Sequence, residues 1–204
     1  MATILFPLPD RDFDVTEVAV PWKLLRERGH EVIFATPEGK VAAADPLLLT
    51  GVVFGALGAR PEPKAFYREL ERAPEFLHPR RWDEVDPDQI DALFLAGGHA
   101  QGMKPYLESA AVQRLATAFF AQDKPVAAIC HGAQILAAAG VLQGRGCSAY
   151  PACSAEVVLA GGKFAEIAID AAVTDGNLVT APAWPAHPAW IAQFLKLLGT
   201  RIEP

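Results

Sequence analysis

Residues 125 to 134 read Pro125-Val126-Ala127-Ala128-Ile129-Cys130-His131-Gly132-Ala133-Gln134. Four small or β-branched apolar residues lead directly into a cysteine, and a helix is predicted to follow over residues 133–139, closed by Gly140. A strand that feeds a helix through one reactive side chain is the arrangement of a nucleophile elbow. The pattern predicts that Cys130 sits in a strained turn, at the carboxyl end of a strand and above a helix N-terminus.

Apolar runs of strand length alternate with amphipathic runs of helix length along the rest of the chain, which favours an α/β fold with a mostly parallel sheet. We predict strands at 3–6, 31–36, 92–96 and 126–129, helices at 15–28, 105–122, 133–139 and 185–198, and a hairpin of 171–174 with 178–180 around Asp175-Gly176-Asn177.

The segment 46–89 interrupts this alternation. It contains several prolines, a helix-like piece at 63–72, and the aromatic residues Phe66, Tyr67 and Trp82, which we expect to be exposed. We interpret it as an insertion in a single domain of residues 1–204, serving either as a cap over the site or as surface decoration.

The composition excludes several classes of protein. Hydrophobic residues make up 51% of the 204 residues and charged residues 21%, as in a globular domain. The net charge of −6 argues against a nucleic-acid partner, and no apolar run reaches the roughly 20 residues of a membrane span. The N-terminus is expected to be a strand rather than a signal peptide. The odd number of cysteines, three, favours a reducing, cytoplasmic location.

Cys130 is the predicted nucleophile, with a thiolate that the helix N-terminus stabilises and whose pKa it lowers. His131 follows directly, so its side chain need not face the sulfur, but its backbone N–H is placed to serve an oxyanion hole. Gly98 is the predicted second donor, because Gly97-Gly98-His99 ends another core strand.

Glu17 lies in the opening turn of the first helix. Taken alone, a carboxylate there merely interacts favourably with the helix dipole. The ends of the first strand and of the elbow strand, however, face the same crevice of a doubly wound sheet. A carboxyl kept partly protonated by burial there would hydrogen-bond the cysteine sulfur and pass a proton to substrate.

The pattern predicts neither a metal nor a cofactor. Cys130, Cys147 and Cys153 lack zinc-finger spacing, no histidine-rich cluster is visible, and there is no glycine-rich phosphate cradle. Cys147 and Cys153 are interpreted as structural thiols, with a peroxide-sensing disulfide as the alternative.

Three segments together resemble the ThiJ/PfpI superfamily, which has the class I glutamine amidotransferase-like fold: the elbow at 128–132, the turn at 97–99, and Glu17-Val18-Ala19-Val20-Pro21. The resemblance implies a flavodoxin-like three-layer α/β sandwich with an active cysteine at the elbow. It also implies that a glutamate four residues before a proline, here Glu17, hydrogen-bonds that cysteine.

The resemblance is closest to the branch with glyoxalase III and chaperone members. It implies a cofactor-independent enzyme that converts small reactive carbonyls, such as methylglyoxal to lactate. His131 would pair with a downstream acid, for which Glu156, Glu166 and Asp170 are candidates. His99 and His187 are expected near the substrate pocket, and alanine-rich edge helices favour a homodimer.

Two alternatives remain open at this point. One is a redox sensor or holding chaperone in which Cys130 oxidises beside Glu17 and the aromatic residues of 46–89 bind client proteins. The other is an amide or peptide hydrolase, or a glutamine amidotransferase-like protein. The elbow also fits the amidotransferase pattern, but His187-Pro188-Ala189 lacks the glutamate that would orient the base. We expect His187 instead to cap the last helix.

Overall fold

The computed structural model describes residues 1–51 and 58–200. Its strands are β1 Thr3–Pro7, β2 Arg11–Phe13, β3 Glu31–Thr36, β4 Ala43–Ala44, β5 Arg80–Arg81, β6 Ala92–Leu95, β7 Val126–Ile129, β8 Gly146–Cys147, β9 Lys163–Phe164, β10 Val173–Asp175 and β11 Leu178–Ala181. Its α-helices are α1 Val15–Glu27, α2 Pro46–Thr50, α3 Pro61–Leu70, α4 Pro74–Leu77, α5 Lys104–Leu107, α6 Ala110–Ala121, α7 Ala133–Ala138, α8 Ser154–Leu159 and α9 His187–Leu197.

Seven strands form the central sheet, in the order β10-β11-β7-β6-β1-β3-β5. Every pairing in it is parallel except that of β10 with β11. The buried strands β6 and β7 are continuously apolar because helices cover both of their faces. The predicted α/β fold with a mostly parallel sheet is therefore confirmed.

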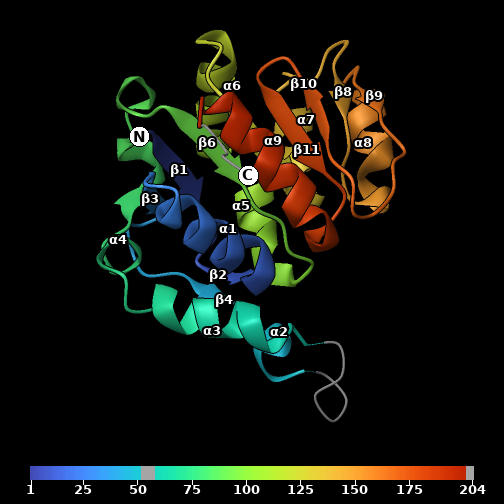
Figure 1. The fold of residues 1–204 in the computed structure, drawn as a ribbon. Coiled ribbons are helices and arrows are strands. Elements are labelled where there is room, and N and C mark those ends of the chain that lie inside the picture. Colours follow the sequence, from blue (N-terminus) through green and yellow to red (C-terminus); the bar gives the residue numbers. More distant parts are fainter. Residues whose placement is uncertain (52–57, 201–204) are drawn as a thin grey trace.

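The strand order places the candidate site. The chain moves from β1 to β3 in one direction along the sheet and from β6 to β7 in the other, so right-handed crossovers put α1 and α6 on opposite faces (Figure 1). The order reverses between β1 and β6. A crevice opens outside the carboxyl ends of the strands at such a reversal, and the segments after β1, β6 and β7 meet there.

Most of the predicted elements are confirmed. The strands at 31–36 and 126–129 have the predicted bounds, and α1 ends one residue before the predicted end. The hairpin forms around Gly176-Asn177, with β10 beginning at Val173. The single helix predicted over 105–122 is wrong: it divides into α5 and α6. Ser109 divides it, since its hydroxyl accepts a hydrogen bond from Val112 N–H at 3.3 Å and starts a new helix.

The segment 46–89 is more closely packed than its sequence suggests. Tyr67 and Trp82 are 4% and 7% exposed, so the expectation of exposed aromatic residues is wrong for both, whereas Phe66 is half-buried. Trp82 Nε1–H donates to the carbonyl of Ala35, and β5 pairs with β3. Residues 52–57 of this segment lie outside the described residues, and its role as a cap stays a prediction.

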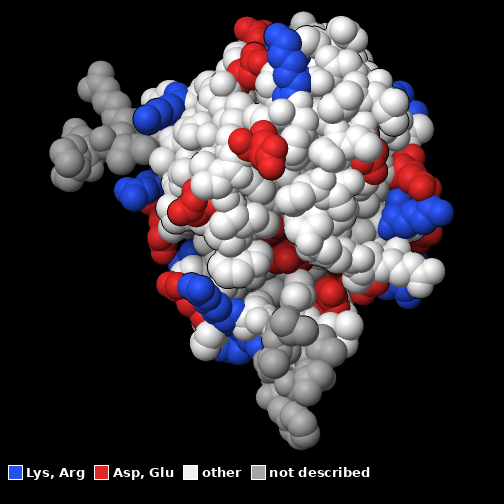
Figure 2. Space-filling view, turned by 90° about the vertical axis from the view of Figure 1, so that its right-hand side faces the viewer, with Lys and Arg blue, Asp and Glu red and all other residues white. Residues whose placement is uncertain are grey.

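Figure 2 shows the face that carries α8, β8 and β9, where charged side chains of both signs are dispersed between wide uncharged areas. Val158 and Leu159 of α8 are exposed, and so is Ile169, which follows β9 in the chain. Within the described ranges, no helix has both the length and the apolar character needed to cross a bilayer.

Phe94 provides a test of how the core depends on this sheet. It is 1% exposed, stacks on Phe6 with a centroid distance of 4.1 Å, and contacts Trp190 of α9 at 4.7 Å. Phe94→Ala should lower the free energy of unfolding in urea by about 3–5 kcal/mol, since a cavity would remain between β6 and α9. Leu159→Ala, at a position 86% exposed, is the matched control and should change it by less than about 0.5 kcal/mol. Equal effects would contradict this account of the core.

Candidate active site

Cys130 follows β7 in a strained backbone conformation. Its φ is +56°, a value that non-glycine residues rarely adopt, and Ile129 before it is extended. Residues Cys130–Gly132 form a 3-10 turn that leads into α7. Gly132 lies so close to β6 that a Cβ there would be 2.4 Å from the carbonyl oxygen of Leu95. The predicted strained elbow is therefore confirmed, and the glycine allows the turn to approach the neighbouring strand.

Glu17 joins the start of α1 to the end of β6. Its carboxyl is 1% exposed, and its Oε2 accepts a hydrogen bond of 2.8 Å from the backbone N–H of Gly97. Burial raises the pKa of Glu17 well above its usual value, and the nearby carboxyl of Asp14 raises it further. The hydrogen bonds to Gly97 and to the Cys130 side chain act in the opposite direction. The surroundings of Glu17 therefore favour the partly protonated carboxyl expected from the sequence.

Asp14 is a buried residue of the site that the sequence analysis missed. Its carboxylate caps α1 by accepting from the N–H groups of Thr16 and Glu17 at 2.7 and 3.1 Å, and its own N–H donates to the carbonyl of Gly97. The signal was present in the sequence, because Asp14-Val15-Thr16-Glu17 has the spacing of a capping box. In the structure the glutamate reaches Gly97 instead of the amide of Asp14.

Gly97 is the point at which these groups converge. A Cβ on this residue would lie 2.8 Å from Cβ of Cys130, 2.8 Å from Oε2 of Glu17 and 2.9 Å from the backbone nitrogen of His131. Any side chain larger than hydrogen would separate the carboxyl from the thiol. Gly98 lines the adjoining cavity together with His131, and their roles as oxyanion donors stay predictions.

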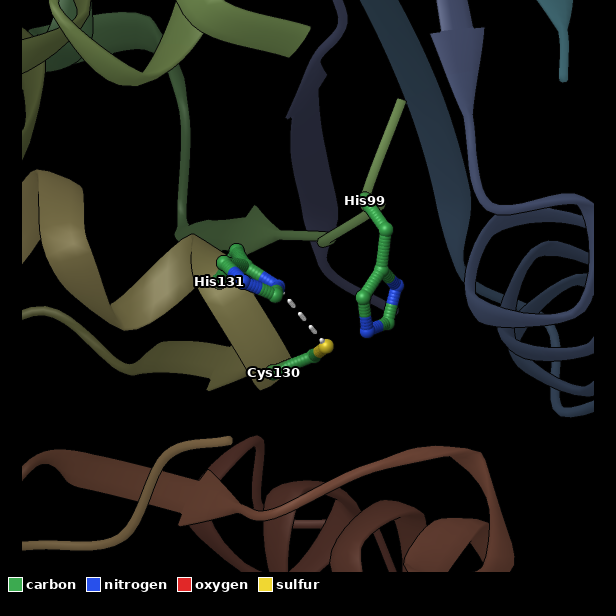
Figure 3. Close-up of side chains that lie close together, drawn as sticks. All are labelled: His99, Cys130 and His131. Carbon is green, nitrogen blue, oxygen red and sulfur yellow. Dashed lines mark hydrogen bonds between the residues drawn. The ribbon is translucent and has the colours of Figure 1, made fainter. Parts of the chain in front are cut away.

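The imidazole of His131 faces the sulfur of Cys130, with Nδ1 at 3.3 Å from Sγ (Figure 3). The sequence left this orientation open. Burial and the neighbouring His99 lower the pKa of His131, whereas Glu156 raises it. Three acids are candidates for the partner of His131. Glu156 lines the cavity that Gly98 and His131 also line, and its carboxylate accepts a hydrogen bond from Gln134. Glu166 lines a different cavity.

The thiol of Cys130 does not have the low pKa predicted from its place before a helix. Burial raises the pKa of the thiol, a negative charge on Glu17 would raise it further, and the backbone N–H of His131 lowers it. Cys130 is 1% exposed and α7 has only six residues, so desolvation exceeds the effect of the helix N-terminus. That prediction is wrong, and the thiol needs a base within reach.

His99 and Tyr150 complete the surroundings of His131. The ring centroids of the two imidazoles are 4.6 Å apart, those of Tyr150 and His99 are 4.9 Å apart with the rings nearly perpendicular, and Tyr150 stacks on His131 at 5.2 Å. A cavity of about 770 Å³ adjoins both imidazoles. Tyr150 carried no signal in the sequence, because it lies in a loop whose amide meets the carbonyl of Cys130 only in the folded chain.

His187 lies apart from this cluster. It is buried in the wall of a second cavity of about 530 Å³, which Asp14 and Trp184 also line. Its ring stacks on Trp190, and its Nε2 has no hydrogen-bond partner among the described residues. No side chain caps α9, so the expected capping role of His187 is wrong.

The structure brings together groups that the sequence keeps apart. Ligand atoms of His99, Cys130 and His131 lie within 4.8 Å of one another, although the sequence shows no histidine-rich cluster. The cause is the parallel sheet, in which β6 and β7 are neighbours and end at the same edge. Cys147 and Cys153 are buried free thiols.

This chain is similar in sequence to a known protein family and to several of its members. The profile of the DJ-1/PfpI family matches residues 2–197. The chain is 39% identical over 188 residues to protein DJ-1 homolog D of Arabidopsis thaliana, a match covering 92% of this chain and 45% of that protein. It is 34% identical over 186 residues to a protein named a deglycase from Pyrococcus abyssi, covering 91% and 93%. The chain therefore spans about half of the plant relative and nearly all of the archaeal one.

Solved structures share the fold. Glyoxalase III from Candida albicans superposes with a TM-score of 0.75 at 18% identity, covering 98% of both chains. A DJ-1 superfamily protein from Agrobacterium tumefaciens superposes with a TM-score of 0.71 at 25% identity, covering 99% of this chain and 92% of that one.

Gly97→Ala tests the convergence at this glycine. The new methyl group would press on Cys130 and Glu17 at 2.8 Å, so the free energy of unfolding should fall by about 1–3 kcal/mol. The matched control is Gly146→Ala, whose Cβ would have its nearest contact at 3.4 Å and should cost less than about 0.5 kcal/mol. Chemical denaturation of both variants measures the difference, and equal losses would show that the site is not crowded at Gly97.

His187 makes a prediction about pH. Burial lowers the pKa of His187 to about 3, below the value of about 6.5 expected in the unfolded chain. Between these values the unfolded chain binds a proton that the folded protein does not, so stability falls as the pH drops below about 6.5. From pH 7 to pH 5, the wild type should lose ~2 kcal/mol more unfolding free energy than His187→Phe. Denaturation curves at both pH values measure this, and parallel losses would contradict it.

Proposed function

This chain belongs to the DJ-1/PfpI family, and from that membership we propose that it is a cysteine-dependent enzyme that acts on small reactive carbonyl compounds without a cofactor. The observation that carries the proposal is the buried carboxyl of Glu17, whose pKa is raised by burial and which converges with the Cys130 thiol at Gly97. Relatives named deglycases support the substrate class.

The first step requires a base for the thiol. His131 Nδ1, 3.3 Å from the sulfur, takes the thiol proton as Sγ of Cys130 attacks the aldehyde carbon of the substrate. The carbonyl oxygen gains the negative charge that the carbon–oxygen double bond releases. Glu17 gives its proton to this oxygen, and the product of the step is a hemithioacetal with a Glu17 carboxylate beside it.

The second step uses the carboxylate that the first has created. With methylglyoxal as substrate, Glu17 removes the proton from the former aldehyde carbon and returns it to the neighbouring carbon. The hydroxyl proton of the hemithioacetal passes to the ketone oxygen, so the hemithioacetal becomes a thioester and the ketone becomes an alcohol. Water then hydrolyses the thioester to lactic acid and the free thiol, and the proton that His131 took in the first step passes to Glu17. The sum is one methylglyoxal and one water for one lactic acid.

The amides of Gly98 and His131 are the proposed donors to the oxyanion. Donors held in place by the backbone stabilise developing charge without having to reorganise during the reaction. Gly98 comes from the end of β6 and His131 from the elbow, so the two amides approach the reacting carbonyl from neighbouring strands. The cavity of about 770 Å³ beside them would admit a three-carbon substrate and leave space for water.

One observation favours a second candidate, a hydrolase of amide bonds. The His131 imidazole faces the Cys130 sulfur, as a nucleophile–base pair requires, and Glu156 lines the same cavity. No hydrogen bond joins Glu156 to His131 among the described residues, so the acid of a complete triad is not in place. The burial of Tyr67 and Trp82 removes two aromatic residues from the client surface proposed for a chaperone.

The deciding experiment measures lactate formed from methylglyoxal by the purified protein without added glutathione. Cys130→Ala should abolish turnover, and Glu17→Gln should lower kcat by at least about 100-fold, because an amide still accepts from Gly97 but carries no transferable proton. Cys147→Ala, at a buried cysteine with a free thiol, is the control and should keep wild-type turnover.

The alternatives are tested with the same proteins. Activity of Glu17→Gln equal to wild type would refute the proton shuttle, and wild-type protein that is inert towards methylglyoxal but releases ammonia or amine from small amides would favour the hydrolase. Failure with both substrate classes would sink the enzymatic proposal, and titration with peroxide would then test oxidation of Cys130.

A further inference from the structure

His99, Cys130 and His131 form a cluster on two turns of the chain. His99 follows the Gly97-Gly98 turn after β6, whereas Cys130 and His131 form the elbow after β7. Figure 3 shows the two imidazoles flanking the sulfur. One ligand atom of each residue lies within 4.8 Å of the other two, and no other group of three such residues was found in the described ranges.

The distances approach those of a zinc site. Zinc–sulfur and zinc–nitrogen bonds of about 2.3 and 2.0–2.1 Å at a tetrahedral angle place sulfur and nitrogen about 3.5 Å apart. The observed distance from Cys130 Sγ to His131 Nδ1 is 3.3 Å. The three ligand atoms lie within 4.8 Å of one another, so a shift of His99 by roughly 1 Å would bring the set towards tetrahedral geometry. His99 is exposed, so its side chain has room for a shift of this size.

The surroundings limit the movement of both imidazoles. Tyr150 stacks on His131 and lies nearly perpendicular to the ring of His99, and the two histidine rings are themselves in contact. Rings held in this way lose little further freedom when they bind a cation. Glu156 on the same cavity adds a nearby negative charge, while Lys104 on that cavity wall pairs with Glu108.

The donor set selects the metal. Two imidazole nitrogens and one thiolate suit Zn²⁺, whereas Mg²⁺ and Ca²⁺ prefer oxygen ligands. Three protein ligands leave a fourth position open, and here the cavity of about 770 Å³ lies beside both histidines.

We propose that His99, Cys130 and His131 form a binding site for Zn²⁺, with the fourth coordination position directed to the adjoining cavity. Binding exchanges the S–H bond of Cys130 for a sulfur–zinc bond, and the thiol proton passes to solvent. The sulfur lone pair that attacks carbonyls in the proposed reaction is then occupied. Zn²⁺ at this site is therefore a reversible inhibitor that a chelator removes.

The experiment titrates the apoprotein with Zn²⁺ against a chromophoric chelator, and with Co²⁺ while its absorption spectrum is recorded. We expect one ion per chain and a thiolate-to-cobalt charge-transfer band, which Cys130→Ser abolishes. His99→Ala and His131→Ala should each weaken Zn²⁺ binding by at least about tenfold, since even an outer-shell partner of a zinc ligand contributes about 10–100-fold. His78→Ala, at an exposed histidine outside the cluster, should bind as the wild type does.

Two results would overturn the proposal: a Zn²⁺ affinity that His99→Ala leaves unchanged, or bound Co²⁺ without the charge-transfer band. If Cys130→Ser does not fold, His99→Ala decides, because it alters an exposed side chain. Binding is measured without substrate, so the zinc site stands or fails independently of turnover. A protein that binds zinc but is inert towards carbonyls would refute the proposed function alone.

Discussion

The buried carboxyl of Glu17 ties the start of α1 to the end of β6, by accepting the backbone N–H of Gly97 at 2.8 Å. A carboxyl that is 1% exposed is costly to ionise, and its burial therefore depends on this hydrogen bond and on protonation. Asp14 reinforces the junction, because its backbone N–H donates to the carbonyl of the same glycine. The junction sets the position of Cys130, whose Cβ lies just beyond the vacant side-chain position of Gly97.

Burial also determines how the pair reacts. The same desolvation that raises the pKa of Glu17 raises that of the Cys130 thiol, so the two groups hold their protons in the resting site. A helix N-terminus favours a thiolate, but α7 has only six residues and Cys130 before it is 1% exposed. Activation is left to His131, whose lowered pKa keeps the imidazole neutral and able to accept a proton.

The arrangement of side chains around His131 has two chemical consequences. An imidazole at 3.3 Å from a thiol can take its proton, and with a second imidazole nearby the same lone pairs can bind a cation. Carbonyl chemistry and zinc would therefore compete for a single sulfur. Tyr150 serves both, because its ring restricts the two imidazoles without bonding to the sulfur.

The sequence by itself determined most strands of the central sheet and the strained elbow at Cys130, because local hydrophobic periodicity and turn chemistry carry that information. It also indicated that Glu17 would be buried near the thiol, since strand ends meet at a reversal of strand order. Only the tertiary structure decided the direction of the thiol pKa, the burial of Tyr67 and Trp82, and the meeting of His99 with Cys130 and His131. Each of these depends on desolvation or on contact between residues far apart in the chain, and neither is encoded in the spacing of neighbouring residues.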